Sequence, residues 1–400
     1  MRLAVLGGSF NPVHLGHLFL ADAVLSALRY DRVVLIPAYR SPFKLAAANM
    51  ESSGCDRLEL LAASITGDPR LTVDDCEIRR EGVSYTADTL ESVIRRYMPE
   101  GKPGLIIGDD LAAGFLQWHK SGEILDRADI IVARRLASAE VSCPFPHRRI
   151  TNEMMEISSA MVRERIESAG AWRYLVPQAA RTIIEDRRLY GFSGEAPPAA
   201  DSSGAGPAQK SIIRVEEAAR ESLSMERFLH SRNTALLAWD LCRRFGLDPA
   251  LGYLAGIAHD LGKSLDEETL LAMAKSDGRA VSKLEKKKPA LLHGRAAAIL
   301  LRERFSIHNR DVLEAVALHT EGAAGMGPLA KVVYIADKVE VSREKIDPAL
   351  RRMCYANEDL DRILFAVLNQ TVSWLRSKKL ELSEETFRLL EKMKEPVPKS

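Results

Sequence analysis

Long apolar runs, paired cysteines and a strong net charge are all missing from this 400-residue sequence. No apolar run approaches 18 residues, and the first is broken by Gly7, Gly8, Asn11 and Pro12, so we expect neither a membrane span nor an export signal. The five cysteines include no CxxC pair, which favours reduced, buried thiols in a cytoplasmic protein over disulfides or a zinc site. With 56 basic and 55 acidic residues, charge alone indicates no nucleic-acid or membrane partner.

Apolar side chains are also scarce in one internal segment, residues 193–211 (SGEAPPAADSSGAGPAQKS). Small residues, glycine and proline bury too little apolar surface to offset the entropy of ordering. The segment therefore predicts a flexible linker between two domains, 1–192 and 212–400, and the chain length fits two or three domains.

The pattern of apolar residues differs on the two sides of this linker. Before it, short β-rich runs alternate with helical stretches at 16–28, 56–66 and 86–97, which is typical of an α/β domain with a parallel sheet. The predicted strands are residues 3–7, 32–38, 71–78, 104–110 and 129–135. After the linker, periodic segments predict an all-α domain with helices at 224–245, 249–262, 294–305, 309–320 and 328–340.

Residues 7–17, GGSFNPVHLGH, stand where the first strand meets the first helix. We expect the strand to end at Leu6 and a turn at residues 7–9 to let the backbone approach a phosphate. His14 and His17, three residues apart at the helix start, can face the same ligand. A glycine pair or one histidine is often structural, but the combined spacing is far more specific.

A second candidate phosphate element is ISSAMVR at residues 157–163. Ser158 and Ser159 are typical helix N-cap residues, and Arg163 lies one turn into the helix that they begin. Hydroxyls, backbone N–H groups and a guanidinium can therefore converge on one phosphate chain. Taken alone, the same residues would be an ordinary capping motif.

Both elements resemble the nucleotidyltransferase family that carries HxGH and I-S-S-T-x-x-R, although Ala160 replaces the threonine. The resemblance implies a Rossmann-like fold and transfer of a nucleotidyl group from ATP with Mg²⁺, releasing pyrophosphate. It places His14, His17 and Arg163 in catalytic roles and puts Gly7, Gly8, Ser9, Phe10, Ser158 and Ser159 at the nucleotide. A phosphate nucleophile is already anionic at pH 7, so this reaction needs no general base.

Further stretches at 36–44, 84–90, 106–125 and 132–135 resemble nicotinate-nucleotide adenylyltransferase in particular. That resemblance implies that nicotinate mononucleotide is the acceptor. It places Lys44, Thr86, Trp118 and Arg134 at the acceptor and Asp110 at the adenosine. Each has an alternative reading: Trp118 as a core residue, Lys44 and Arg134 as surface charges, and Asp110 as a helix cap.

Two departures from this pattern, Phe43 for histidine and Leu136 for proline, concern the acceptor rather than the chemistry. His119 and His147 match no motif, and we interpret them as surface or structural residues.

The helical half places histidines and aspartates among apolar residues at helix ends and on inward faces. They are His230, His259, Asp260, His293, His319 and Asp337. Any one of these histidines alone would suit a protein core. The mixture of imidazole and carboxylate suits iron, manganese or zinc, and a carboxylate shared by two ions is typical of enzymes that attack phosphorus.

The order of these six residues resembles the HD-domain phosphohydrolases, and HGRAAA, HTEG and IADKVE resemble the bacterial symmetrical diadenosine tetraphosphate hydrolases. The resemblance implies two iron ions bridged by Asp260. His230, His259 and Asp337 would hold one ion, His293 and His319 the other, and Lys263 would meet a phosphate. The chain departs from the residues usual in that family at Leu261, Gly262, Glu321 and Val341. These departures concern the choice of substrate more than metal binding. His308 is interpreted as a cap or surface residue, and Glu285 to Lys288 as a solvated face.

The sequence thus predicts a bifunctional enzyme whose partners are ATP, nicotinate mononucleotide and diadenosine tetraphosphate. Two alternatives stay open. In the first, the folds are the same but the acceptor is another one, such as nicotinamide mononucleotide or phosphopantetheine, and the HD domain acts on another nucleotide. In the second, the HD domain senses a nucleotide and does not cleave it. A homo-oligomer also stays open.

Overall fold

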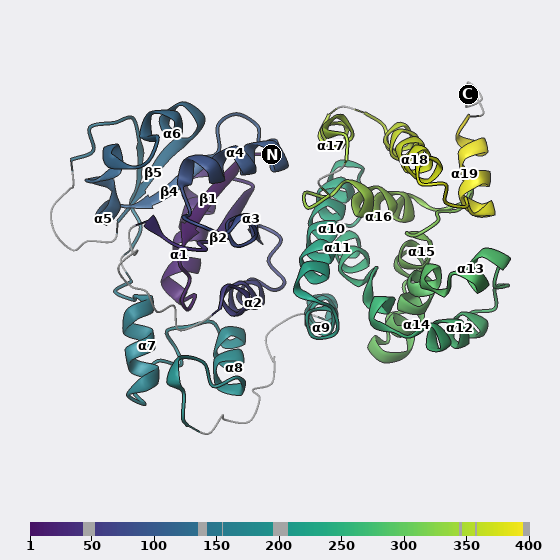
Figure 1. The fold of residues 1–400 in the computed structure, drawn as a ribbon, viewed down its shortest axis with the longest axis horizontal. Coiled ribbons are helices and arrows are strands. Elements are labelled where there is room, and N and C mark those ends of the chain that lie inside the picture. Colours follow the sequence, from purple (N-terminus) through teal and green to yellow (C-terminus); the bar gives the residue numbers. More distant parts are fainter. Residues whose placement is uncertain are drawn as a thin grey trace. The chain divides into compact units, whose positions relative to one another are not determined.

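The computed structural model describes residues 1–42, 53–134, 142–153, 155–194, 207–343, 346–356 and 358–394. The chain divides into two units, Met1–Asp201 and Ser202–Ser400, and each is described by itself (Figure 1). The predicted fold classes are confirmed. The first unit is built on a parallel sheet, and the regular elements described in the second unit are all helical.

Six parallel strands form the sheet of the first unit in the order β3-β2-β1-β4-β5-β6. They are β1 Leu3–Gly8, β2 Arg32–Pro37, β3 Leu71–Val73, β4 Gly104–Gly108, β5 Asp129–Ala133 and β6 Arg148–Ile150. All residues of β2 are buried, as expected for an inner strand of a parallel sheet that helices cover on both faces. The strand order changes direction between β1 and β4, and α/β proteins bind ligands beyond the carboxyl ends of the strands at such a point.

The helices of this unit surround the sheet (Figure 1). They are α1 Leu15–Leu28, α2 Gly54–Ser64, α3 Cys76–Arg80, α4 Thr86–Tyr97, α5 Asp109–Ala112, η2 Phe115–Gln117, α6 Ser121–Arg127, α7 Ser159–Glu167, α8 Gln178–Asp186 and η3 Leu189–Gly191. In α4 the buried residues Leu90, Val93 and Tyr97 recur every three or four positions, which is the spacing of one helix face. The predicted helices agree with α1, α2 and α4 within two residues at each end.

Three details of the predicted strands are wrong. Gly7 and Gly8 belong to β1 and pair with Ile36 and Pro37, so the turn begins only at Ser9. The strand predicted at 71–78 ends at Val73, because the buried Asp74 carboxylate accepts a hydrogen bond from the Cys76 N–H (2.8 Å) and α3 follows. Strand β6 was not predicted, because it is short and exposes both of its arginines.

Thirteen helical segments are described in the second unit. They are α9 Pro207–Ser222, α10 Met225–Arg244, α11 Pro249–Ala258, η4 Leu261–Ser264, α12 Glu267–Ser276, α13 Lys283–Lys287, η5 Pro289–Leu292, α14 His293–Phe305, α15 Arg310–Leu318, α16 Pro328–Val339, α17 Pro348–Met353, α18 Leu360–Ser377 and α19 Glu384–Lys394. The five predicted segments correspond to α10, to α11 with η4, and to α14, α15 and α16. None of the helices among the described residues is both long enough and apolar enough to cross a bilayer.

The segment predicted as a linker is partly helical, because α9 begins at Pro207; residues 195–206 lie outside the described residues. A buried carboxylate, that of Glu216, connects helix α9 to the rest of the second unit. The Glu216 carboxylate accepts hydrogen bonds from Arg232 Nε (3.1 Å) and from the Tyr253 hydroxyl (3.0 Å), and none of the three residues is more than 2% exposed.

The charged run at 285–288 is not a fully solvated face. Lys286 and Lys287 are exposed, but Glu285 is buried and its carboxylate pairs with Arg295 at 3.0 Å. The Glu285 carboxylate also accepts a hydrogen bond from the Ser282 N–H, which closes a capping box at the start of α13. The five cysteines form no disulfide.

Candidate functional sites

The two histidines of GGSFNPVHLGH lie together where β1 leads into α1. His14 caps the N-terminus of α1 and is 3% exposed, and its ring stacks on His17 with 3.6 Å between ring centroids. The His14 backbone N–H donates to His17 Nδ1 (3.2 Å). Because Nδ1 accepts this bond, a neutral His17 ring carries its proton on Nε2 and presents an N–H donor, which suits an anionic ligand.

Gly16, between these histidines, leaves no room for a side chain. A Cβ atom at this position would stand 3.1 Å from His14 Nδ1 and 3.2 Å from Cε1. Few real Cβ atoms have such close neighbours, so a larger residue would displace the His14 ring. The glycine of HLGH therefore allows the two rings to stack.

Helix α7 is attached to the same loop, as the phosphate motifs predict. The Ser159 hydroxyl donates to the Pro12 carbonyl (2.9 Å), and Arg163 Nη1 donates to the Asn11 carbonyl (2.7 Å). The Ser158 hydroxyl accepts from the Met161 N–H (3.2 Å) and caps the helix. The structure thus brings ISSAMVR beside GGSFNPVHLGH, although 140 or more residues separate them in sequence.

Three of the predicted acceptor and adenosine residues follow strands or begin a helix. Asp110 is exposed in the first turn of α5, directly after β4, and Thr86 begins α4. Arg134 follows β5, and Asn152 holds its backbone at 2.8 and 3.0 Å. Ligands of this fold bind at such positions. Trp118 instead caps the end of η2 and is half-buried beside Phe115, with 5.2 Å between ring centroids.

Lys44, Phe43 and Leu136 lie outside the described residues. His119 is exposed and contacts the ring of Tyr85, and His147 is half-buried with Nδ1 2.8 Å from the Phe145 carbonyl.

One buried residue at this site was missed from sequence. Arg57 of α2 donates from Nη1 to the carbonyls of Ser9 (2.8 Å) and Ala38 (2.7 Å). No motif marks this arginine, and only its complete burial in the fold distinguishes it from the other arginines of the chain.

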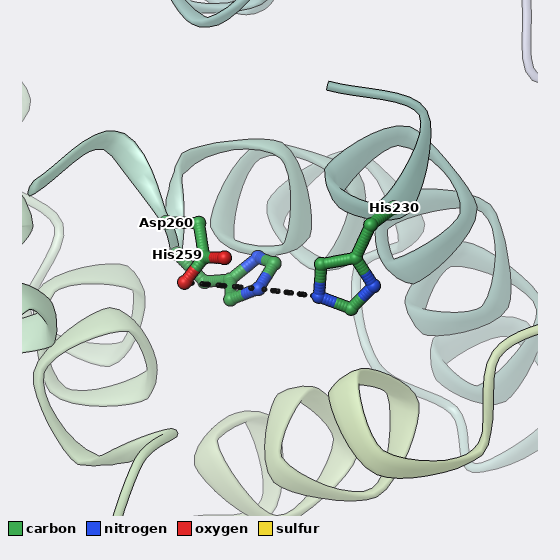
Figure 2. A group of neighbouring side chains, drawn as sticks. All are labelled: His230, His259 and Asp260. Atoms are coloured by element: carbon green, nitrogen blue, oxygen red, sulfur yellow. Dashed lines mark hydrogen bonds and ion pairs between the residues drawn. The ribbon is translucent and has the colours of Figure 1, made fainter. Parts of the chain in front are cut away.

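In the second unit, the six predicted ligand residues converge from six different elements. His230 lies on α10 and Asp337 on α16. His259, His293 and His319 occupy the C-cap positions of α11, η5 and α15, and Asp260 precedes η4. Figure 2 shows His230, His259 and Asp260 pointing toward one another.

Three overlapping sets of these side chains have ligand atoms close enough to hold an ion. They are His230, His259 and Asp260; His259, His319 and Asp337; and Asp260, His293 and His319. Asp260 Oδ1 lies 3.1 Å from His293 Nε2, 3.5 Å from His259 Nε2 and 3.7 Å from His319 Nε2. Asp337 Oδ1 lies 3.1 Å from His230 Nε2 and 3.7 Å from His259 Nε2.

Hydrogen bonds on the outer side of each imidazole ring fix its orientation. The Nδ1 atoms of His259, His293 and His319 lie 2.7 to 2.8 Å from carbonyls three residues earlier, those of Gly256, Ala290 and Val316. His230 Nδ1 lies 3.0 Å from Glu340 Oε1. Metal-binding histidines are typically held in this way, with Nδ1–H donated outward and the Nε2 lone pair directed to the ion.

The Nε2 lone pairs of these histidines are suited to bind a cation. His293 Nε2 and His319 Nε2 are only 2.9 Å apart although both rings donate from Nδ1, so two lone pairs face each other. Burial lowers the pKa of His259 to about 3 and also lowers that of His293, which keeps both rings neutral at pH 7. Burial tends to raise the pKa of Asp260, but the neighbouring imidazoles outweigh it and hold the carboxyl ionised.

Charged side chains around Asp337 complete the site and were missed from sequence. Lys338 Nζ donates to Asp337 Oδ2 (2.5 Å) and to the His319 carbonyl (3.0 Å). Arg343 Nη2 donates to Asp337 Oδ1 (2.7 Å) and lies 3.1 Å from His230 Nε2. Burial opposes a charged His230, but its bonds to Asp337 and Glu340 outweigh burial and raise its pKa to about 9.

Gly262 permits the close approach of two of these elements. A Cβ atom there would stand 2.3 Å from the His293 carbonyl oxygen, so no other residue fits without moving backbone. The predicted phosphate contact Lys263 follows on η4 and is half-buried. His308, in contrast, is exposed beside the N-cap residue Asn309.

Two family models match the chain, one in each half. Residues 5–165 match the cytidylyltransferase-like model, and residues 227–342 match the HD domain model. A protein of Treponema pallidum (strain Nichols), described as a probable nicotinate-nucleotide adenylyltransferase, is 40% identical over 204 residues; the match covers 48% of this chain and 99% of that protein. A protein of Borreliella burgdorferi with the same description is 36% identical over 190 residues, covering 48% of this chain and 97% of the other.

A solved structure from Clostridium acetobutylicum, described as a predicted HD superfamily hydrolase involved in NAD metabolism, is 28% identical. The match covers 45% of this chain and 95% of that one, with a TM-score of 0.43. Sequence identity to the two spirochaete proteins extends over nearly their whole length. The chain therefore belongs, through its N-terminal half, to the nicotinate-nucleotide adenylyltransferase family, and its C-terminal half carries an HD domain of the phosphohydrolase type.

Proposed function

We propose that the first unit transfers AMP from magnesium-bound ATP to nicotinate mononucleotide and releases deamido-NAD and pyrophosphate. The observation that carries this proposal is the attachment of α7 to the loop before α1 by Ser159 and Arg163. It puts two histidines, a guanidinium and a helix N-terminus around one loop, and all of these stabilise negative charge. The described relatives of this half support the choice of acceptor.

In this reaction an oxygen of the acceptor phosphate attacks the α-phosphorus of ATP. A new P–O bond forms while the bond between the α-phosphorus and the bridging oxygen breaks, and pyrophosphate leaves. No proton has to move, because the attacking phosphate is already an anion. His17, with its Nε2–H donor, His14 and Arg163 would stabilise the charge that builds on the phosphate oxygens.

The remaining predicted residues would bind the two substrates. Thr86, Trp118 and Arg134 would lie at nicotinate mononucleotide, together with Lys44, and Asp110 would lie at the adenosine.

We further propose that the HD unit hydrolyses diadenosine tetraphosphate to two ADP. Water adds to one of the two inner phosphorus atoms, and the bridge between the inner phosphates breaks. Two transition-metal ions, proposed to be iron, would be held by His230, His259 and Asp337 and by His293 and His319, with Asp260 shared, and would supply positive charge at the reacting phosphorus. Lys263 and Arg343 are the cationic side chains placed to meet the other phosphates.

A paired assay of the intact chain tests both proposals. The wild-type chain should form deamido-NAD from nicotinate mononucleotide and ATP, and ADP from diadenosine tetraphosphate. His17→Ala should abolish only the first activity and Asp260→Ala only the second. His308→Ala is a control, because His308 is exposed beside the helix cap Asn309 and is none of the proposed site residues, and it should preserve both activities.

Other outcomes would change the proposals in defined ways. Dinucleotide formed from nicotinamide mononucleotide or phosphopantetheine, but not from nicotinate mononucleotide, would overturn the acceptor. An HD unit that holds less than one transition metal per chain and releases no ADP would be a nucleotide sensor. Metal analysis of the purified chain also decides between iron, manganese and zinc.

A further inference from the structure

Arg57 is a completely buried arginine at the ligand edge of the sheet. Its Nη1 donates to the carbonyl of Ser9, which directly follows β1, and to that of Ala38, which directly follows β2 (2.8 and 2.7 Å). One guanidinium therefore ties the loop that leads to His14 to the segment that leaves the neighbouring strand.

Arg57 forms no ion pair in the described part of the chain, and its Nε and Nη2 atoms are buried without a hydrogen-bond partner. The neighbouring carboxylate of Asp56 is bound to Ser53 and Arg187. Glu77 is the carboxylate whose charge raises the pKa of Arg57, but it makes no ion pair with the guanidinium and accepts its hydrogen bond from Thr89 (2.5 Å).

The position of Arg57 on its own helix adds to the positive potential. The residue lies in the first turn of α2, where the helix dipole is positive and a cation is disfavoured. Burial lowers its pKa, but an arginine keeps its charge in a protein. A buried ion without a partner is costly, and an anionic ligand is the usual compensation.

We propose that Arg57 is a positioning residue of the nucleotide site. It holds the loop at Ser9 through two carbonyls, and its charge, which no ion pair in the described residues neutralises, attracts the phosphate chain of ATP. The inference rests on the proposed adenylyl transfer from ATP. In a poorly screened interior, a single charge acts on a phosphate over several ångströms, so Arg57 need not touch the ligand.

Two substitutions in the full-length chain separate the charge from the hydrogen bonds. Arg57→Gln removes the charge and retains one N–H donor group. Arg57→Lys retains the charge but loses the planar guanidinium that bonds to both carbonyls. We expect Arg57→Gln to raise the KM for ATP about tenfold, which corresponds to one charge-assisted interaction. The KM for ATP of Arg57→Lys should stay within about threefold of wild type, even where its thermal midpoint falls.

Arg32→Gln is the matched control. Arg32 is also a buried arginine that donates to a backbone carbonyl, that of Pro69 (3.1 Å), but it begins β2 at the opposite edge of the sheet. Its substitution should lower the thermal midpoint and leave the KM for ATP unchanged.

The proposal is overturned if Arg57→Gln keeps the wild-type KM for ATP, or if Arg57→Lys raises it as much as Arg57→Gln does. Should Arg57→Gln not fold, a tenfold rise for Arg57→Lys alone refutes it. Tripolyphosphate gives a readout without an acceptor, because it should raise the thermal midpoint of wild type but not that of Arg57→Gln. A wild-type chain that binds tripolyphosphate through Arg57 but forms no deamido-NAD would refute the proposed function and preserve this inference.

Discussion

Glu340→Gln should weaken metal binding at the HD site although Glu340 is not one of the predicted ligands. Its carboxylate is 1% exposed and lies 3.0 Å from His230 Nδ1, on the far side of the ring from the cluster. The amide has nearly the same shape and can still accept the imidazole hydrogen bond. The substitution therefore removes the charge behind His230, and it also puts an amide nitrogen at the position of the oxygen that now accepts from the Ser342 N–H (2.6 Å).

The expected loss follows from the distance between the Glu340 charge and an ion at Nε2. The 3.0 Å contact, about 2 Å across the ring and about 2 Å to the ion add to about 7 Å. At an effective dielectric constant of about 20, a unit charge interacts with another over this distance by about 2 kcal/mol. This corresponds to about thirtyfold in affinity, within the range typical of groups that orient metal ligands.

Competition between the protein and a chelator of known affinity measures this loss directly. Glu285→Gln serves as a control, because Glu285 is a buried glutamate of the same unit that pairs with Arg295 instead of a histidine. It should lower the stability of the unit without changing its metal affinity. Wild-type metal affinity in Glu340→Gln would refute the idea that the carboxylate acts through His230.

Three further substitutions have defined outcomes. Gly16→Ala, which brings a Cβ to 3.1 Å from His14 Nδ1, should lower the kcat of adenylyl transfer about tenfold and spare ADP release in the HD assay. Arg232→Met should destabilise the second unit by about 3 to 5 kcal/mol in urea unfolding, because it removes the buried guanidinium that pairs with the Glu216 carboxylate, and adding Glu216→Gln should restore most of that loss. Gly262→Ala, with its Cβ 2.3 Å from the His293 carbonyl, should reduce the metal content of the purified chain, whereas Gly325→Ala, at an open position, should not.

The sequence predicts most of the residues that gather at the two sites, because their chemistry requires particular side chains at particular spacings. The HD ligands illustrate this: six residues spread over 108 positions come together in three overlapping sets. The residues that orient these ligands have no recognisable signal in the sequence. Glu340, Lys338 and Arg343 are ordinary charged residues in the sequence. Glu340 and Arg343 contact His230 of α10, and Lys338 reaches the His319 carbonyl, so these contacts join parts of the chain that lie far apart in sequence.

Element ends were predicted less well because local signals compete there. The strand expected to reach residue 78 stops at Val73, since Asp74 pairs with Arg96 at 2.6 Å and turns the chain into α3. Arg96 lies 22 positions away, so a local pattern cannot contain this contact. In the same way, α9 begins inside the glycine- and proline-rich segment. Its residue Glu216 forms hydrogen bonds with Arg232 and Tyr253 of the second unit, and these contacts stabilise the helix.

The two halves use histidine in opposite ways, and the backbone group that meets Nδ1 decides which. Before α1 that group is an N–H, that of His14, which donates to His17 Nδ1 and leaves Nε2 as a donor for an anion. For His259, His293 and His319 it is a carbonyl three residues earlier, which accepts Nδ1–H and leaves Nε2 as a lone pair for a cation. His293 also begins α14, so the contact at Nδ1, and not the end of the helix, separates the two roles. This contact carries functional information that the spacing of histidines in the sequence does not.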